Sequence, residues 1–80
     1  EETSQSNFNL YPNPTSGRLH IESDETIHEY KVVNIMGQSV AFGNINGTQG
    51  EIGLNGLVPG LYFIQLTTES GRTTQKFIIR

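Results

Sequence analysis

The chain has 80 residues, room for one small domain, and its hydrophobic content of 34% is modest for a chain that must bury a core. A net charge of −3 and five scattered Lys and Arg residues leave no basic stripe, which argues against nucleic-acid binding. The absence of Cys excludes a disulfide framework and a thiolate metal site, and no apolar run approaches the roughly 20 residues that span a bilayer.

The abundance of strand-forming residues sets the expected fold class. The sequence has eight Thr, eight Ile, four Val and nine Gly against one Ala and one Met. Such a composition disfavours helix and favours short strands joined by tight turns. We therefore expect an all-β domain.

The first seven residues, Glu1–Asn7, are polar and lack apolar periodicity, so we expect a solvated linker there and folded structure from residue 8 onward. The chain begins with neither an initiator Met nor a signal peptide. This start indicates a fragment of a larger protein, with any export leader located upstream.

A proline-rich corner follows the first expected strand. Phe8–Leu10 alternates as a short strand, and Tyr11–Pro14 stops it because each proline removes a backbone donor. Gly17 completes the turn and is a candidate for a positive φ angle. Arg18–Glu22 then resumes as a strand.

The middle of the chain predicts two strands around a turn. The strands are expected at Ile27–Val33 and Gln38–Phe42, and Asn34–Gly37 has Asn first and Gly fourth, as a type I turn prefers. The polar segments Ser23–Thr26 and Gly43–Gly50 are expected to be connections.

The last third of the chain predicts a short strand, Glu51–Leu54, and then a hairpin of Leu61–Thr68 and Arg72–Ile79 around the turn Glu69–Gly71. Partial apolarity on both faces of the hairpin suggests a central position in the sheet. Six or seven strands at intervals of roughly 10 residues are typical of an antiparallel β-sandwich. The side chains expected to face the core are Leu19, Ile21, Tyr30, Val32, Val40, Phe42, Ile52, Leu54, Tyr62, Ile64, Leu66, Phe77 and Ile79.

The titratable residues form no catalytic or metal-binding pattern. His20 and His28 are the only histidines, and neither belongs to an HxH or HExxH motif. Asp24, Glu25 and Glu29 are clustered, but a sandwich of this size has little room for a cleft that excludes water. We therefore expect no enzymatic activity, no metal site and no cofactor.

The final strand offers its backbone and its charges to a partner. An edge strand has unpaired amides that can accept a partner strand, and the run Lys76–Arg80 has no polar tail after it. In the alternative interpretation, Phe77 and Ile79 belong to the core, and Lys76 and Arg80 are charged residues that discourage aggregation.

Four motifs in a fixed order point to a known family. They are YPNP with the glycine that follows it, VVNIMGQSV, LVPGLYFIQL and KFIIR, at Tyr11–Gly17, Val32–Val40, Leu57–Leu66 and Lys76–Arg80. By these motifs, residues 8–80 resemble the type A C-terminal sorting domain of cargo proteins exported by the bacterial type IX secretion system. One departure is Asn34, where Asp is also common in such domains, and either residue suits the start of a turn.

The resemblance implies an immunoglobulin-like sandwich at the C-terminus of a larger exported protein of a Gram-negative bacterium. It implies that the parent protein crosses the inner membrane, folds in the periplasm and passes the outer membrane because the translocon recognises this domain. A sortase-like peptidase then removes the domain, with Glu1–Asn7 as the expected region of cleavage. The cargo is released or attached to the cell surface, and the domain itself does no chemistry.

The resemblance also suggests which residues matter. The residues expected to be recognised by the secretion machinery are Lys76, Phe77, Ile78, Ile79 and Arg80. The residues expected to shape the motifs are Tyr11, Pro12, Asn13, Pro14, Gly17, Asn34, Gly37, Pro59, Gly60 and Tyr62. Among them, Gly37 is expected to close a hairpin and Gly60 to direct the strand after it.

An alternative function is an accessory adhesion or carbohydrate-binding sandwich of an extracellular enzyme. Such modules usually present a planar set of aromatic side chains. In this sequence most of the aromatic residues are expected in the core, and Tyr11 is the one expected outside it.

Overall fold

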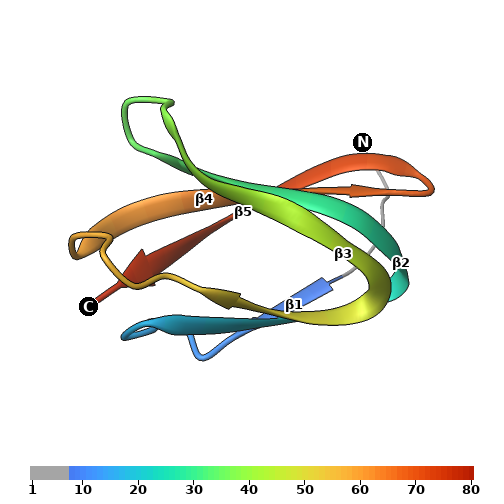
Figure 1. Ribbon diagram of the computed structural model, residues 1–80, viewed down its shortest axis with the longest axis horizontal. Helices are drawn as coiled ribbons and strands as arrows, with labels where there is room; N and C mark the ends of the chain where they lie inside the picture. The colour runs from blue at the N-terminus through green and yellow to red at the C-terminus, as the bar shows by residue number, and fades with distance from the viewer. Residues whose placement is uncertain (1–7) are drawn as a thin grey trace.

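The computed structural model describes residues 8–80, and every regular element in this part of the chain is a β-strand (Figure 1). The pairings between these strands are all antiparallel. The strands are β1 (Phe8–Tyr11), β2 (Arg18–Asn34), β3 (Ser39–Gly53), β4 (Gly60–Thr68) and β5 (Gly71–Ile79). The expected all-β, antiparallel fold class is confirmed.

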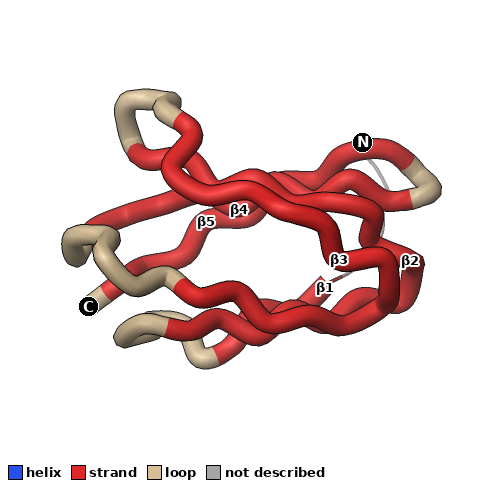
Figure 2. The backbone as a smooth tube through the Cα atoms, viewed as in Figure 1, coloured by secondary structure: helices blue, strands red, loops and turns tan. Residues whose placement is uncertain are grey.

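The long strands β2 and β3 belong to both layers of one curled sheet. The first part of β2 pairs with β1 and with the end of β3, and its last part pairs with the start of β3 and with β4. Figure 2 shows the two strands passing together from one layer into the other. The pairing register of β2 with β3 shifts between Glu22 and Ile27. The sheet thereby curls, and its two layers face each other across the core.

The number of separate strands differs from the expectation. Six or seven were expected and the described residues form five, because Ser23–Thr26 and Gly43–Gly50 continue as strand. Gly43–Gly50 stays extended because several of its residues pair with β2. In Ser23–Thr26, Ser23 pairs with Phe8 of β1, and the pairing of β2 with β3 resumes at Ile27 after a register shift. The central position expected for the last hairpin is correct for β4 and wrong for β5, which lies at the edge of the sheet. The immunoglobulin-like arrangement remains a prediction.

The core is one apolar cluster between the two layers. On β4, the alternation of buried and half-buried residues follows the period of two that the sequence predicts. Tyr30 and Val40 are half-buried and pack against this cluster. The buried hydrophobic side chains are Leu10, Leu19, Ile21, Ile27, Val32, Ile52, Leu54, Tyr62, Ile64, Leu66, Phe77 and Ile79.

The inward orientation expected for Phe42 is wrong, because its side chain is 77% exposed. Between the pairs Val32 with Ala41 and Val33 with Ser39, the register of β2 with β3 shifts. Successive side chains of a strand point to opposite faces, so a one-residue shift reverses which of them meets the core. Ala41 packs against the core in place of Phe42.

Candidate recognition surface

The four sequence motifs meet at one end of the molecule, where Figure 1 shows the chain's C-terminus beside the loops that precede β2, β3 and β4. Tyr62 lies between two other motifs, because it pairs with Asn34 of β2 on one side and with Phe77 of β5 on the other. The proline-rich corner joins the same end through a bridge between Thr15 and Ile79. Segments that are far apart in sequence therefore form one surface.

The proline-rich corner holds the end of β5. The N–H of Thr15 donates to the carbonyl oxygen of Ile78 at 2.9 Å, and the N–H of Arg80 donates to the carbonyl oxygen of Thr15 at 2.8 Å. The N–H of Ile78 donates to Oδ1 of Asn13 at 3.1 Å. These three hydrogen bonds clamp the last residues of β5 against the corner. Sequence reasoning missed this contact, because no local pattern links residues more than 60 positions apart.

Thr15 is itself fixed by the turn around it. Its side chain is 1% exposed, and its Oγ1 accepts hydrogen bonds from the N–H of Gly17 at 3.3 Å and of Arg18 at 3.2 Å. The same hydroxyl donates to the carbonyl oxygen of Arg18. The positive φ expected for Gly17 is wrong, since the residues with positive φ in residues 8–80 do not include it. The hydroxyl of Thr15 closes this turn without a left-handed glycine.

The turn between β2 and β3 is organised by Asn34, as the sequence predicts. Its Oδ1 accepts hydrogen bonds from the N–H of Met36 at 2.9 Å and of Gln38 at 3.0 Å, and its carbonyl oxygen accepts one from Gly37 at 2.9 Å. Gly37 has a φ of 82°, a conformation that favours glycine. The tip projects Ile35 and Met36, whose side chains are 72% and 78% exposed.

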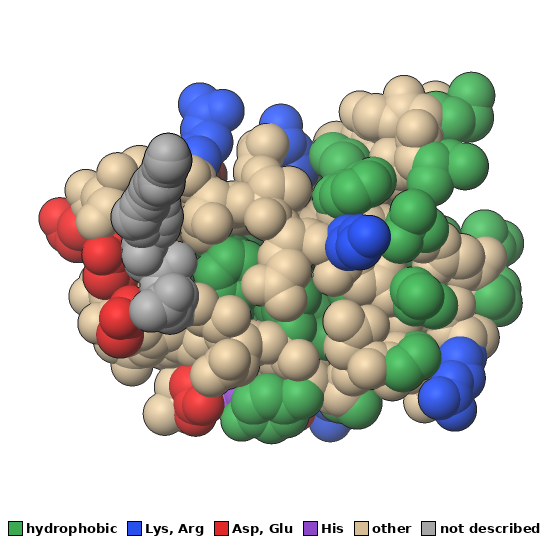
Figure 3. Space-filling model, turned by 180° about the vertical axis from the view of Figure 1, so that it is seen from behind, with side chains coloured by type: hydrophobic (Ala, Val, Ile, Leu, Met, Phe, Trp, Pro, Cys, Tyr) green, Lys and Arg blue, Asp and Glu red, His purple; other side chains and the backbone are tan. Residues whose placement is uncertain are grey.

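The segment before β4 packs beside this tip. The hydroxyl of Tyr62 donates to the carbonyl oxygen of Val58 at 2.6 Å, and its ring stacks on that of Phe77 with centroids 5.9 Å apart. Gly60, at the start of β4, has a φ of 155°. Between tip and segment lies a hollow of about 210 Å³ lined by Asn34, Ile35, Met36, Val58, Pro59, Gly60, Leu61 and Tyr62. None of these residues is charged, and Figure 3 shows hydrophobic side chains gathered towards one end of the molecule.

The last strand divides the expected recognition residues between two faces. Phe77 and Ile79 are buried in the core, whereas Lys76, Ile78 and Arg80 are exposed. A partner that meets the folded domain can therefore touch the side chains of the second group only. The alternative interpretation was right about the core position of Phe77 and Ile79.

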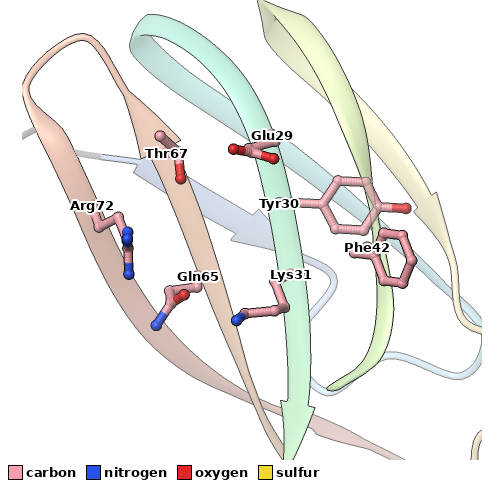
Figure 4. Close-up of a pocket in the computed structure, with 7 residues that line it drawn as sticks. All are labelled: Glu29, Tyr30, Lys31, Phe42, Gln65, Thr67 and Arg72. Carbon is pink, nitrogen blue, oxygen red and sulfur yellow. The ribbon is translucent and has the colours of Figure 1, made fainter.

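The layer formed by the last part of β2, the start of β3, β4 and β5 carries a shallow hollow of about 290 Å³ (Figure 4). Its lining comes from four strands, with Lys31 on β2 and Arg72 on β5 standing on either side of Gln65 on β4. The complete lining is Glu29, Tyr30, Lys31, Phe42, Gln65, Thr67 and Arg72. Within residues 8–80, neither of its two cations forms an ion pair with a carboxylate.

The opposite end of the domain is acidic. The hydroxyl of Ser70 donates to Oε2 of Glu25 at 2.6 Å, and this hydrogen bond holds the pKa of Glu25 below its ordinary value. His28 lies 3.1 Å from Oε2 of Glu69, whereas the ring of His20 packs on Tyr11 with centroids 4.8 Å apart. The two histidines do not converge. In the part of the chain that the structure describes, no group of three or more His, Asp or Glu side chains is placed to hold a metal ion.

Comparison with known families gives a match over almost the whole chain. A family model described as "Secretion system C-terminal sorting domain" matches residues 9–80. A comparison with curated protein sequences found no match. Residues 8–80 contain no helix long and apolar enough to cross a membrane.

Proposed function

Because the chain belongs to the family of secretion system C-terminal sorting domains, the signal domains of type IX secretion, we propose that it directs a cargo protein fused upstream across the outer membrane. The cargo passes through the periplasm and ends at the cell surface or in the medium. A sortase-like peptidase then removes the domain, and the cut falls within Glu1–Asn7, which lies outside the described residues. In this proposal the domain is a substrate of the peptidase and does no chemistry.

The convergence of the four motifs at one end of the fold is the observation that carries this proposal. A sorting signal has to be read by other proteins, and residues read in the folded state need exposed side chains in one place. This end has exposed apolar side chains at Ile35, Met36 and Val58, beside the exposed side of β5. Large exposed apolar side chains that cluster mark a site of protein contact.

The role of the C-terminal run follows from its two faces. Phe77 and Ile79 anchor β5 in the core, and Lys76, Ile78 and Arg80 face solvent. We assign contact with the translocon to the exposed three. The motif residues Gly37, Pro59 and Gly60 act indirectly, because they shape the turns that place the contact residues.

Export of a fusion protein tests the proposed function. Residues 1–80 are fused to the end of a periplasmic reporter, in a bacterium that has the type IX machinery and in an otherwise identical strain that lacks its translocon. The reporter is expected at the cell surface or in the medium of the first strain and in the periplasm of the second. Retention of the reporter in the periplasm of both strains would refute the proposal.

A carbohydrate-binding module is the second candidate function, and one observation favours it. Tyr11 is exposed and packs on His20 beside an open hollow of about 340 Å³. An exposed aromatic ring of this kind can stack on a sugar. Polysaccharide binding that is lost on Tyr11→Ala, together with unchanged export of the same variant, would support this candidate.

A further inference from the structure

Residues 8–80 leave part of the β5 edge unpaired. β5 pairs with β4 along one side, and on its other side the described residues bond only to its last part, through Asn13 and Thr15. These bonds use the N–H and the carbonyl of Ile78, so the backbone groups of Ile78 point away from β4. Along an antiparallel strand, the backbone groups of alternate residues point the same way. The same orientation therefore recurs at every second residue before Ile78.

Three exposed residues, Arg72, Thr74 and Lys76, share this outward orientation. The pairing of β4 with β5 runs from Gly60 to Thr68 without a register shift, so the alternation is not interrupted. The open stretch of five residues is about 17 Å long, which is enough to pair with a short strand. An unpaired edge of this kind is a template for strand addition.

The charges along this edge favour an acidic partner. Residues 71–80 contain three of the five Lys and Arg residues of the chain and none of its eight Asp and Glu residues. β5 itself, Gly71–Ile79, carries Arg72 and Lys76, so its charge is opposite in sign to the net charge of −3 of the whole chain. In Figure 3, acidic side chains gather towards the end of the molecule that lies away from the hydrophobic cluster. Complementary charge speeds encounter and fixes register.

We propose that the edge of β5 from Arg72 to Lys76 receives an extended acidic segment of the export machinery, which joins the sheet as an added strand. The backbone groups of Thr74 hold the segment in register, and Arg72 and Lys76 pair with its carboxylates. The clamp on Ile78 confines the added strand to the earlier part of β5. This inference rests on the proposed function and names the chemistry of the partner.

Arg72 and Lys76 could serve two other roles, and each role predicts a different outcome when these residues are changed. Charged residues on an edge strand also prevent self-association, and a charge of either sign serves that purpose. An anionic lipid surface would attract the cations without using the backbone of Thr74. Reversing the charge of Lys76 and removing the N–H of Thr74 therefore separate the three roles.

Binding of a peptide probe is the first test. The probe is a ten-residue peptide of alternating Glu and Val, and the control replaces Glu with Lys. Amide NMR shifts of the 80-residue chain are expected to change with the acidic peptide first at Arg72, Thr74 and Lys76, and to weaken as salt is added. Equal shifts with the basic peptide, no shifts, or shifts spread over the whole surface would overturn the inference.

Matched variants locate the contact. Lys76→Glu is expected to weaken binding of the acidic peptide by about tenfold. Lys31→Glu makes the same change of charge on β2, about 14 Å from an added strand, and is expected to bind as the wild type does. Thr74→Pro removes an N–H that faces away from β4, so the fold is retained and binding is lost. Anionic vesicles distinguish the lipid role, because Thr74→Pro would leave vesicle binding intact.

Export of the same variants separates this inference from the proposed function. If the wild-type fusion is exported and Lys76→Glu and Thr74→Pro are retained, while Lys31→Glu is exported, the inference and the proposed function both hold. If all four fusions are exported equally, the proposed function stands and the added strand is refuted. If the wild-type fusion fails to leave the periplasm, the proposed function fails, and the peptide measurement alone decides whether the edge accepts an acidic strand.

Discussion

Thr15 connects two parts of the fold through its hydrogen bonds. Its backbone joins the proline-rich corner to β5, and its hydroxyl satisfies backbone groups of the turn that follows. All of this takes place around a side chain that is almost fully buried. A buried polar group that loses its partner costs more than an exposed one, because water cannot replace the lost hydrogen bond.

Thr15→Val keeps the shape of the side chain and removes the hydroxyl. We expect a loss of about 1–3 kcal/mol in the free energy of unfolding, because the N–H groups of Gly17 and Arg18 lose their acceptor. Urea denaturation measures the change, with Thr15→Ser, which retains the hydroxyl, as the control. A valine variant as stable as the wild type would show that the turn does not depend on this group.

The contact between Glu25 and Ser70 predicts a pH dependence. Since the pKa of Glu25 is lowered in the folded state, the contact contributes its full stability above the ordinary value of 4.5 and loses it as the pH falls through the folded value. Wild type is therefore expected to be more stable than Glu25→Gln at neutral pH, with the difference vanishing in acid. Thermal unfolding at several pH values measures this, and Ser70→Ala should abolish the difference. A wild-type advantage that grows in acid would contradict the assignment.

The elements are shaped by a few turn residues. β2 turns back into β3 at Asn34, and β4 starts at Gly60, whose φ is positive. Both positions could be picked out from the sequence, because the turn chemistry is local. The hairpin of β4 and β5 around the turn at residues 69 and 70 was predictable for the same reason.

Asn34→Ala is expected to destabilise the hairpin of β2 and β3 by about 1 kcal/mol, because the N–H groups of Met36 and Gln38 lose the Oδ1 acceptor. Asn34→Asp retains an acceptor at that position and should cost much less. Urea denaturation of the two variants is the measurement. Equal losses for both would mean that the side-chain acceptor is not what stabilises the turn.

Gly60→Val tests the backbone requirement at the start of β4. No atom lies within 4 Å of the place that a Cβ would occupy, so the expected cost of about 1–3 kcal/mol comes from the positive φ alone. Gly53 offers a matched control, since a Cβ there also meets nothing within 4 Å and its φ is ordinary. Gly53→Val should be close to neutral in thermal unfolding. A Gly60→Val variant as stable as Gly53→Val would show that the positive φ at residue 60 does not require glycine.

Some features of the strands could not be predicted from the local sequence pattern. β2 continues through Ser23–Thr26 across a register shift against β3, and no local pattern marks such a shift. The exposure of Phe42 depends on a register shift, and an alternating pattern reads the same in either register. The clamp of Thr15 on β5 joins residues that are adjacent only after folding. Sequence reasoning therefore placed most strands and turns, and it missed the contacts that bring the motifs together.

At the scale of the whole molecule, the domain has two unlike ends. One end gathers the four motifs, the apolar hollow and the end of β5, and the other has the acidic residues of the bend in β2 and of the turn after β4. An uneven distribution of charge and apolar surface orients a protein as it approaches a partner. We therefore expect the export machinery to recognise the motif-bearing end of the folded domain.

Export of two matched surface variants tests that claim most directly. Met36→Asp places a charge in the apolar hollow at the motif-bearing end, and Phe42→Asp makes the same kind of change at an equally exposed side chain that does not line this hollow. Both variants are expected to fold, because both side chains are exposed, and thermal unfolding checks this. We predict that a reporter fused to Met36→Asp stays in the periplasm while one fused to Phe42→Asp reaches the cell surface or the medium. Equal export of the two fusions would contradict the account.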